Sequence, residues 1–254
     1  MKQRIRKLLP HERIQVAHLF EAWEETMILS CLQGVMGGIY APDTARPQSA
    51  AAQINDFCFL AGTPCGELVD FFLRQNLILT PQNREWAEMI ESVCGDRALR
   101  QTRYAIKKEP GCFDTEKLET FVKCLPEQYA LKQIDRELYH QCLASGWSCD
   151  LVSGFPTYEN YERLGLGFVV TEEGRVVSGA SSYSRYRGGI EIEIDTKPEY
   201  RCRGLATVAG AVLILACIRR GWYPSWDAHN QVSVTLAEKL GYSFSHEYPV
   251  YYAK

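Results

Sequence analysis

Hydrophobic and acidic residues alternate regularly over residues 190–196, IEIEIDT. Isoleucines occupy positions 190, 192 and 194, and Glu191, Glu193 and Asp195 occupy the odd positions. Because successive side chains of a β-strand point to opposite faces, this alternation predicts a strand with one apolar and one acidic face. Pro198, which cannot donate a backbone hydrogen bond, ends the predicted strand.

A glycine-containing turn and a long apolar helix follow. Gly204 has no side chain that would keep a ligand from the backbone, and Leu205 and Ala206 place N–H groups in the first helical turn. Residues 205–218 carry no charge, which predicts a helix buried against a sheet, since a membrane span needs roughly 20 apolar residues. The start of this helix is a candidate anion site.

The rest of the second half alternates strand and helix patterns. A Gly-containing turn at 172–175 predicts a hairpin, Asp135 is a candidate helix cap, and 145–165 holds at most one helix. The predicted strands are 129–134, 167–171, 176–185, 190–196, 224–226 and 248–253, and the predicted helices are 136–142, 205–218 and one ending at Leu240. The pattern indicates an α/β fold, with a mixed sheet and helices on both faces.

The first half also predicts an α/β arrangement. We expect helices at 11–32, 66–74 and 84–94, and strands at 35–40, 54–60, 77–79 and 100–107. Its closing order of short strand, Asn83, helix, Gly95 and strand parallels the order around Asn230 and Gly241. We therefore hypothesise a degenerate copy of the second half, although two unrelated α/β halves could share this order by chance.

These patterns suggest two domains, at 1–115 and 120–254, joined by an irregular linker over 108–115. The first half has no equivalent of the turn at Gly204, because residues 60–64 lack arginine and place Pro64 where a backbone N–H is needed. We therefore expect one cofactor site, in the second half.

Composition narrows the functional classes. The net charge of −3 argues against a nucleic-acid partner bound through a broad basic face. Lys2 begins a basic stretch, but residues 8–10 supply no apolar run, so we expect no signal peptide, no membrane partner and a cytoplasmic protein. The ten cysteines show no zinc-site spacing, so we expect free thiols and no metal.

The segment Arg201-Cys202-Arg203-Gly204-Leu205-Ala206 fills an Arg/Gln-x-x-Gly-x-Gly/Ala pattern. With Pro198 upstream and Asn230 and the Leu240–Tyr242 helix end downstream, residues 128–254 resemble the GNAT superfamily of acyl-CoA-dependent N-acyltransferases. Over the whole chain the sequence resembles bacterial GNAT acetyltransferases that include an antibiotic self-resistance enzyme.

The resemblance implies acetyl-CoA as cosubstrate, with the pantetheine amides paired to the backbone of Ile194 and Thr196. The pyrophosphate would lie on the amides of residues 203–206. The implied cofactor-binding residues are Ile194, Thr196, Arg201, Cys202, Arg203, Gly204, Leu205, Ala206, Asn230 and Ser233. Alternatively, the arginines face solvent and Asn230 is only a helix cap.

Acyl transfer to an amine requires a general base, because an ordinary amine is protonated at neutral pH. Glu191 and Glu193 are the candidates, acting directly or through one water molecule, with mutual repulsion raising the pKa of one of them. Alternatively, they are exposed carboxylates or bind a cationic acceptor. The family often has a tyrosine that protonates the leaving thiolate where this chain has Ala237, which leaves Tyr242, Tyr248, Tyr251 or solvent as alternative acids.

Three functions are compatible with these features. The leading one is an N-acetyltransferase that moves acetyl from acetyl-CoA to a primary amine of a small molecule. The second is a noncatalytic acyl-CoA-binding sensor or scaffold, which Ala237 allows. The third is a peptide or protein N-acetyltransferase. An exposed sheet edge in the first half, or the final strand, could also pair two chains as a homodimer.

Overall fold

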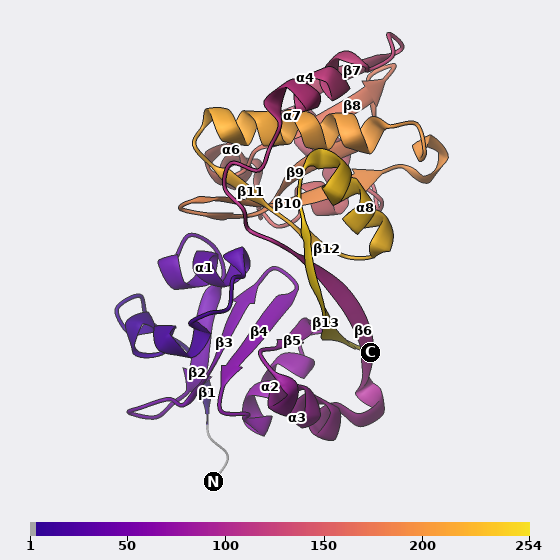
Figure 1. Ribbon diagram of the computed structural model, residues 1–254. Helices are drawn as coiled ribbons and strands as arrows, with labels where there is room; N and C mark the ends of the chain where they lie inside the picture. The colour runs from indigo at the N-terminus through magenta and orange to yellow at the C-terminus, as the bar shows by residue number, and fades with distance from the viewer. Residues whose placement is uncertain (1–3) are drawn as a thin grey trace. The chain divides into compact units, whose positions relative to one another are not determined.

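The computed structural model describes residues 4–254, so Lys2 lies outside the described residues. The chain forms two compact units (Figure 1). The first unit comprises residues 4–103 and 247–254, and the second comprises 104–246. Two strands, β6 (Ala98–Ile106) and β13 (Phe244–Ala253), run from one unit into the other.

The second unit is built on a five-stranded sheet with the order β11-β10-β9-β8-β7. Its strands are β7 (Tyr129–Gln133), β8 (Gly167–Glu172), β9 (Arg175–Tyr186), β10 (Gly189–Thr196) and β11 (Tyr223–Ser225). All neighbours are antiparallel except β10 and β11, which are parallel. The predicted hairpin is confirmed, because Glu173 and Gly174 both adopt the positive φ of a tight hairpin turn.

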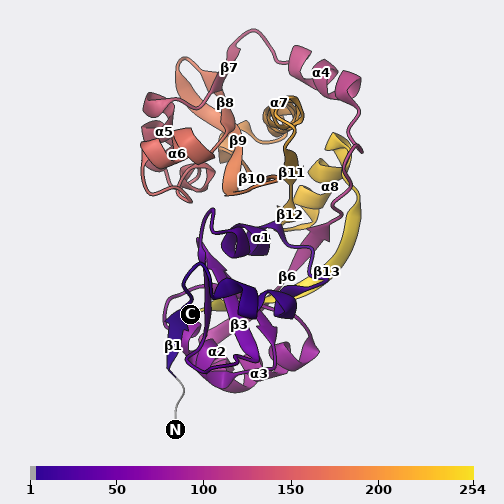
Figure 2. The ribbon, with the colours of Figure 1, turned by 90° about the vertical axis from the view of Figure 1, so that its left-hand side faces the viewer.

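Helices cover both faces of this sheet (Figure 2). One face carries α5 (Arg136–Leu143) and α6 (Tyr158–Leu164), and the other carries α7 (Leu205–Arg219). The uncharged helix α7 is buried along most of its length, as the sequence predicted. Gly210 permits its close packing, because a Cβ there would lie 2.7 Å from Leu240 and 3.1 Å from Ile194.

Helix α8 (Gln231–Leu240) packs beside α7, and the short strand β12 (Asp227–Ala228) pairs with β6. Helix α4 (Thr115–Lys123) was not predicted from the sequence. Its start is marked by Asp114, whose side chain accepts the N–H of Lys117, and Leu118 is buried in the core that α7 also contributes to.

The first unit repeats the strand order of the second. Its strands are β1 (Ile5–Lys7), β2 (Gly38–Pro42), β3 (Ser49–Ile54), β4 (Phe57–Gly62) and β5 (Ile78–Pro81), and its helices are α1 (Thr26–Gln33), α2 (Gly66–Leu73) and α3 (Arg84–Cys94). The strands lie in the order β1-β2-β3-β4-β5, followed by β13. The first four are antiparallel in turn, and β4 and β5 are parallel.

Two predicted elements of the first unit are wrong. Residues 11–32 do not form one helix but two short 3₁₀ turns and then α1, because Ala22 adopts a left-handed φ of 62° and Glu25 is extended. Residues 54–60 are not one strand, because Asn55 with φ of 48° makes the turn between β3 and β4. The strand predicted at 35–40 begins only at Gly38.

The helices predicted at 66–74 and 84–94 are confirmed as α2 and α3. All ten cysteines are free thiols, and Cys58 and Cys217 are buried. Within residues 4–254, no helix combines the length and the apolar character needed to cross a bilayer.

Candidate functional site

The strands β10 and β11 part at Glu191. Their pairing ends where Glu191 meets Ser225, whereas β10 continues to Thr196. Beyond Glu191, Lys197 N donates to Val177 O at 3.0 Å, and Ser178 Oγ donates to Asp195 O at 3.2 Å. Odd-numbered residues of β10 therefore direct their backbone groups toward β9.

Backbone groups of successive strand residues point to opposite sides. Ile194 and Thr196 consequently direct their N–H and C=O groups away from β9, toward the side that β11 has left. An extended ligand with amide groups can pair with such an edge as an added strand would.

The turn after β10 brings a helix N-terminus close to the end of this edge. Cys202 and Gly204 both have positive φ, at 60° and 79°, and Gly204 is the N-cap of α7. No side chain caps α7, so the amides of Leu205 and Ala206 lack that partner. A Cβ on Gly204 would have no neighbour within 4 Å, so the backbone here faces open space.

The two arginines of the turn are partly engaged by the loop. Arg201 Nε donates to Thr196 O at 3.3 Å, at the end of the open edge. The Arg203 guanidinium donates to the Tyr129 hydroxyl at 3.2 Å and lies 4.7 Å from the centre of the Tyr200 ring. Both side chains therefore brace the turn and add positive charge beside the uncapped helix.

Asn230 and Ser233 lie at the start of α8. Asn230 Oδ1 accepts the backbone N–H of Ser233 at 3.0 Å, which is the geometry of a helix cap. Ala237 is completely buried in the core of the second unit. Tyr242 is buried as well, its hydroxyl donates to Pro224 O at 2.7 Å, and burial raises its pKa well above the ordinary value.

The predicted two-faced character of β10 is present. Ile190 and Ile192 belong to the core that α7 completes, whereas the acids occupy the opposite face. Glu191 is 2% exposed, and Glu193 and Asp195 are half-buried. The structure therefore brings the two predicted bases onto one face, beside the open edge.

Asp195 is a member of this face that was not predicted as functional. Burial, the largest cause, and the nearby Asp150 carboxylate together raise the pKa of its carboxyl to about 6, against the opposing effect of Arg201. The alternation that marked Glu191 and Glu193 also contained Asp195, so its position on the face was visible in the sequence. The surroundings that raise its pKa were not visible in the sequence, because Asp150 comes from the distant 3₁₀ turn Cys149–Leu151.

The corresponding edge in the first unit is closed by hydrogen bonds. After the last β4–β5 pair, Gln82 N donates to Leu60 O at 3.1 Å, and Gln82 Oε1 accepts Gly62 N at 3.0 Å. The indole N–H of Trp86 donates to Gly62 O at 2.7 Å. The backbone groups that β10 leaves available are thus occupied in β4.

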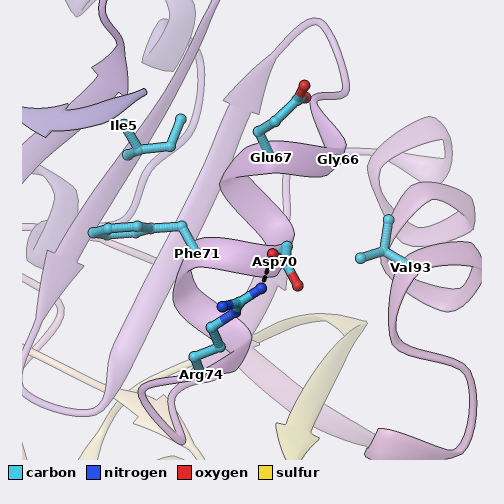
Figure 3. Close-up of a pocket in the computed structure, with 7 residues that line it drawn as sticks. All are labelled: Ile5, Gly66, Glu67, Asp70, Phe71, Arg74 and Val93. Atoms are coloured by element: carbon cyan, nitrogen blue, oxygen red, sulfur yellow. Dashed lines mark hydrogen bonds and ion pairs between the residues drawn. The ribbon is translucent and has the colours of Figure 1, made fainter. Parts of the chain in front are cut away.

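A groove of ≈ 610 Å³ lies along α2 of the first unit (Figure 3). It is lined by Ile5, Gly66, Glu67, Asp70, Phe71, Arg74 and Val93. Glu67 lies in the first turn of α2, and Arg74 is paired with Asp70 at 2.6 Å. A carboxylate at a helix N-terminus occupies the position that favours anions, so this groove is unsuited to a phosphate.

Among residues 4–254, no cluster of three or more His, Cys, Asp or Glu side chains is arranged to hold a metal ion.

Known proteins share this arrangement. The family model described as GNAT acetyltransferase matches residues 17–251. An uncharacterized N-acetyltransferase of Bacillus subtilis (strain 168), YdfB, is 27% identical over 242 residues, which cover 90% of each chain.

Among solved structures, a GCN5-related N-acetyltransferase-like protein from Streptococcus suis 89/1591 matches with a TM-score of 0.92 and 48% identity, over 96% of this chain and 99% of that one. A tandem GNAT protein from the clavulanic acid biosynthesis pathway matches with a TM-score of 0.57 over 98% of each chain, and its 11% identity shows a shared fold alone. The chain therefore belongs to the GNAT acetyltransferase family, an acyltransferase family whose cosubstrate is acetyl-CoA.

Proposed function

We propose that this protein transfers the acetyl group of acetyl-CoA to a primary amine of a small molecule. The single observation that carries the proposal is the open edge of β10, which ends beside the uncapped N-terminus of α7. The backbone of Ile194 and Thr196 would pair with the pantetheine amides. The amides around Gly204, with Arg201 and Arg203 beside them, would bind the pyrophosphate.

The acid face of β10 supplies the base. Glu191 or Glu193 takes a proton from the bound ammonium, directly or through a water molecule. The amine nitrogen then forms a bond to the thioester carbonyl carbon and gives up a second proton to solvent, and the carbon–sulfur bond breaks, which leaves the amide and the CoA thiolate. Asp195, ionised above a pKa of about 6, adds negative charge that attracts a protonated amine.

Helix α8 contains no tyrosine that could protonate the thiolate, and Ala237, at the family's usual tyrosine position, lies in the core. The Tyr242 hydroxyl already donates to Pro224 O. We infer that the thiolate leaves unassisted or takes its proton from solvent. Asn230 acts as the cap of α8, and we assign Ser233 to the same cap through its backbone N–H.

The test compares two glycine variants. Gly204→Glu puts a carboxylate where phosphate would bind, and Gly174→Glu is the matched control, because Gly174 also has a positive φ and an unobstructed Cβ position. Acetyl-CoA-dependent CoA release is measured with a panel of small primary amines. Chromatography quantifies the released CoA, since Cys124 and Cys202 are exposed thiols that would consume a thiol reagent.

We expect turnover in the wild type and in Gly174→Glu, and at least a hundredfold loss of kcat/KM in Gly204→Glu, which is about 2.7 kcal/mol of transition-state stabilisation. Equal activity in both variants would contradict the proposed phosphate site. Binding of acetyl-CoA without turnover of any amine would instead indicate a binding protein.

A further inference from the structure

A row of three polar side chains crosses the sheet of the second unit where β10 and β11 part. Ser184 of β9 lies opposite Glu191, and Ser225, the last residue of β11, lies opposite Glu191 on its other side. Directly opposed residues of neighbouring strands point to the same face. Since Ile190 and Ile192 point into the core beneath α7, this Ser-Glu-Ser row occupies the other face.

The two serine hydroxyls are buried without a partner. Ser184 and Ser225 are both 0% exposed, and neither Oγ has a hydrogen-bond partner among residues 4–254. Other buried serines of β9 are paired: Ser178 with Thr196, Ser181 with Tyr161, and Ser182 with the N–H of Leu166. Unpaired buried hydroxyls are unfavourable, so two of them flanking one carboxylate indicate a ligand-binding role.

The pairing of the strands creates this row. A bulge in the β9–β10 ladder leaves Tyr183 as an extra residue, so that Ser184 faces Glu191 while Ser182 faces Ile192. On the other side of the row, Gly189 has Tyr186 and Tyr223 as its two opposed neighbours. The Ser-Glu-Ser row therefore lies between Tyr186 and Tyr223 on one side and the open edge of β10 on the other.

We propose that the Ser-Glu-Ser row binds an acceptor in which hydroxyl groups flank the reacting amine, that is, a compact amino alcohol. The amine would lie at Glu191, with its hydroxyl groups at Ser184 and Ser225. This inference rests on the proposed acetyl transfer. A serine hydroxyl both donates and accepts a hydrogen bond, as an alcohol does, and neighbouring strands place the serines about 4.8 Å to either side of the carboxylate.

The location suits such an acceptor. Glu191 is the last β10 residue paired with β11, and Ile194, our candidate pantetheine contact, is three residues further along the strand. At about 3.3 Å per residue, an amine at Glu191 lies within reach of the end of the pantetheine arm. The acceptor would be held almost entirely out of water, where each unmatched hydroxyl position weakens binding strongly.

The test uses three amines of matched skeleton: 2-amino-1,3-propanediol, 2-amino-1-propanol and isopropylamine, which carry two, one and no hydroxyl groups. We expect the wild-type kcat/KM to fall at least tenfold with each hydroxyl removed. In the Ser184→Ala and Ser225→Ala double variant, the three values should converge to within about threefold, while the acetyl-CoA KM stays unchanged.

Ser182→Ala is the matched control, because Ser182 is a buried serine of the same strand whose hydroxyl faces the other way and is paired. It should keep the full hydroxyl preference. Equal wild-type values for the three amines, or a preference that survives in the double variant, would overturn the inference and leave the acetyl transfer standing. Failure to bind acetyl-CoA, with no release of CoA for any amine, would overturn both.

Discussion

The two units have the same strand order and direction, but the edge of the fourth strand is open in the second unit and closed by hydrogen bonds in the first. In the second unit β10 runs on from Glu191 to Thr196 after β11 has ended. In the first unit β4 ends at Gly62, and Gln82 and Trp86 bond the backbone that would otherwise be free. The comparison teaches that the fold alone does not make a cofactor site, which requires an unoccupied edge.

The acidic face of β10 also differs from the corresponding face of β4 in the first unit. Counted from the first β10–β11 pair and the first β4–β5 pair, the row formed by Ser184, Glu191 and Ser225 corresponds to Ala52, Phe59 and Thr80 of the first unit. Phe59 packs against aromatic rings, with Trp23 at 5.6 Å and Phe57 at 5.7 Å between ring centroids. The carboxylate of Glu191 thus corresponds to the aromatic ring of Phe59, whereas Thr80, like Ser225, has a buried hydroxyl without a partner among residues 4–254.

The largest effect should come from removing the acids that distinguish the second unit. The double variant Glu191→Gln and Glu193→Gln should lower kcat about a hundredfold, because a general base contributes at least that factor. Acetyl-CoA affinity should change little. Glu67→Gln, which removes an acid of the first-unit groove, is the control and should keep wild-type kcat. A double variant with full kcat would show that neither glutamate takes part in catalysis.

Opening the closed edge of the first unit should cost stability rather than activity. Trp86 is completely buried, and Trp86→Phe removes its bond to Gly62 O along with part of its volume. We expect a loss of about 2 kcal/mol in the free energy of unfolding, measured in urea. The acetyl-CoA affinity of the folded protein should not change. Altered affinity would show that this edge contributes to cofactor binding.

The raised pKa of Asp195 predicts a pH-dependent stability difference. A carboxyl with a folded-state pKa of about 6, above its ordinary value near 4, favours folding when protonated and loses that contribution as the pH rises from about 4 to about 6. Asp195→Asn should therefore stabilise the protein by about 1–2 kcal/mol at pH 7.5 and by much less at pH 4.5. Equal shifts at both pH values would argue against a desolvated carboxylate.

The smallest expected effects come from the helix caps, Asn83 in the first unit and Asn230 in the second. Asn83 Oδ1 accepts the N–H of Trp86 at 3.0 Å, as Asn230 Oδ1 accepts that of Ser233. Asn83→Ala and Asn230→Ala should each lower the free energy of unfolding by about 1 kcal/mol. Calorimetry should find less than a threefold change in the acetyl-CoA Kd for both. A larger change for Asn230→Ala alone would assign its side chain to the cofactor.

The sequence predicted the parts of the second unit that local rules determine. Alternation over 190–196 fixed the two faces of β10, and the uncharged run after Gly204 fixed α7, because burial on one side selects such periodicities. Helix α4 was missed although Asp114 and Leu118 marked it, since the preceding Pro110 and Gly111 suggested only a linker.

Long-range features were not accessible from the sequence. The break at Ala22 depends on a left-handed backbone that nothing in the alanine itself requires. The placement of Ser184 opposite Glu191 depends on the bulge at Tyr183, and that of Ser225 on the register of a parallel pair. Gln82 and Trp86 could not be recognised as closing an edge before β4 and β5 were known to be neighbours.

The most direct test of the central claim is the stoichiometry of acetyl-CoA binding, measured by titration calorimetry on the wild type and on Gly204→Glu. The account predicts one site per chain in the wild type and none in the variant, because only the second unit combines an open edge with an uncapped helix. Two sites per chain, or one site that survives in Gly204→Glu, would contradict it.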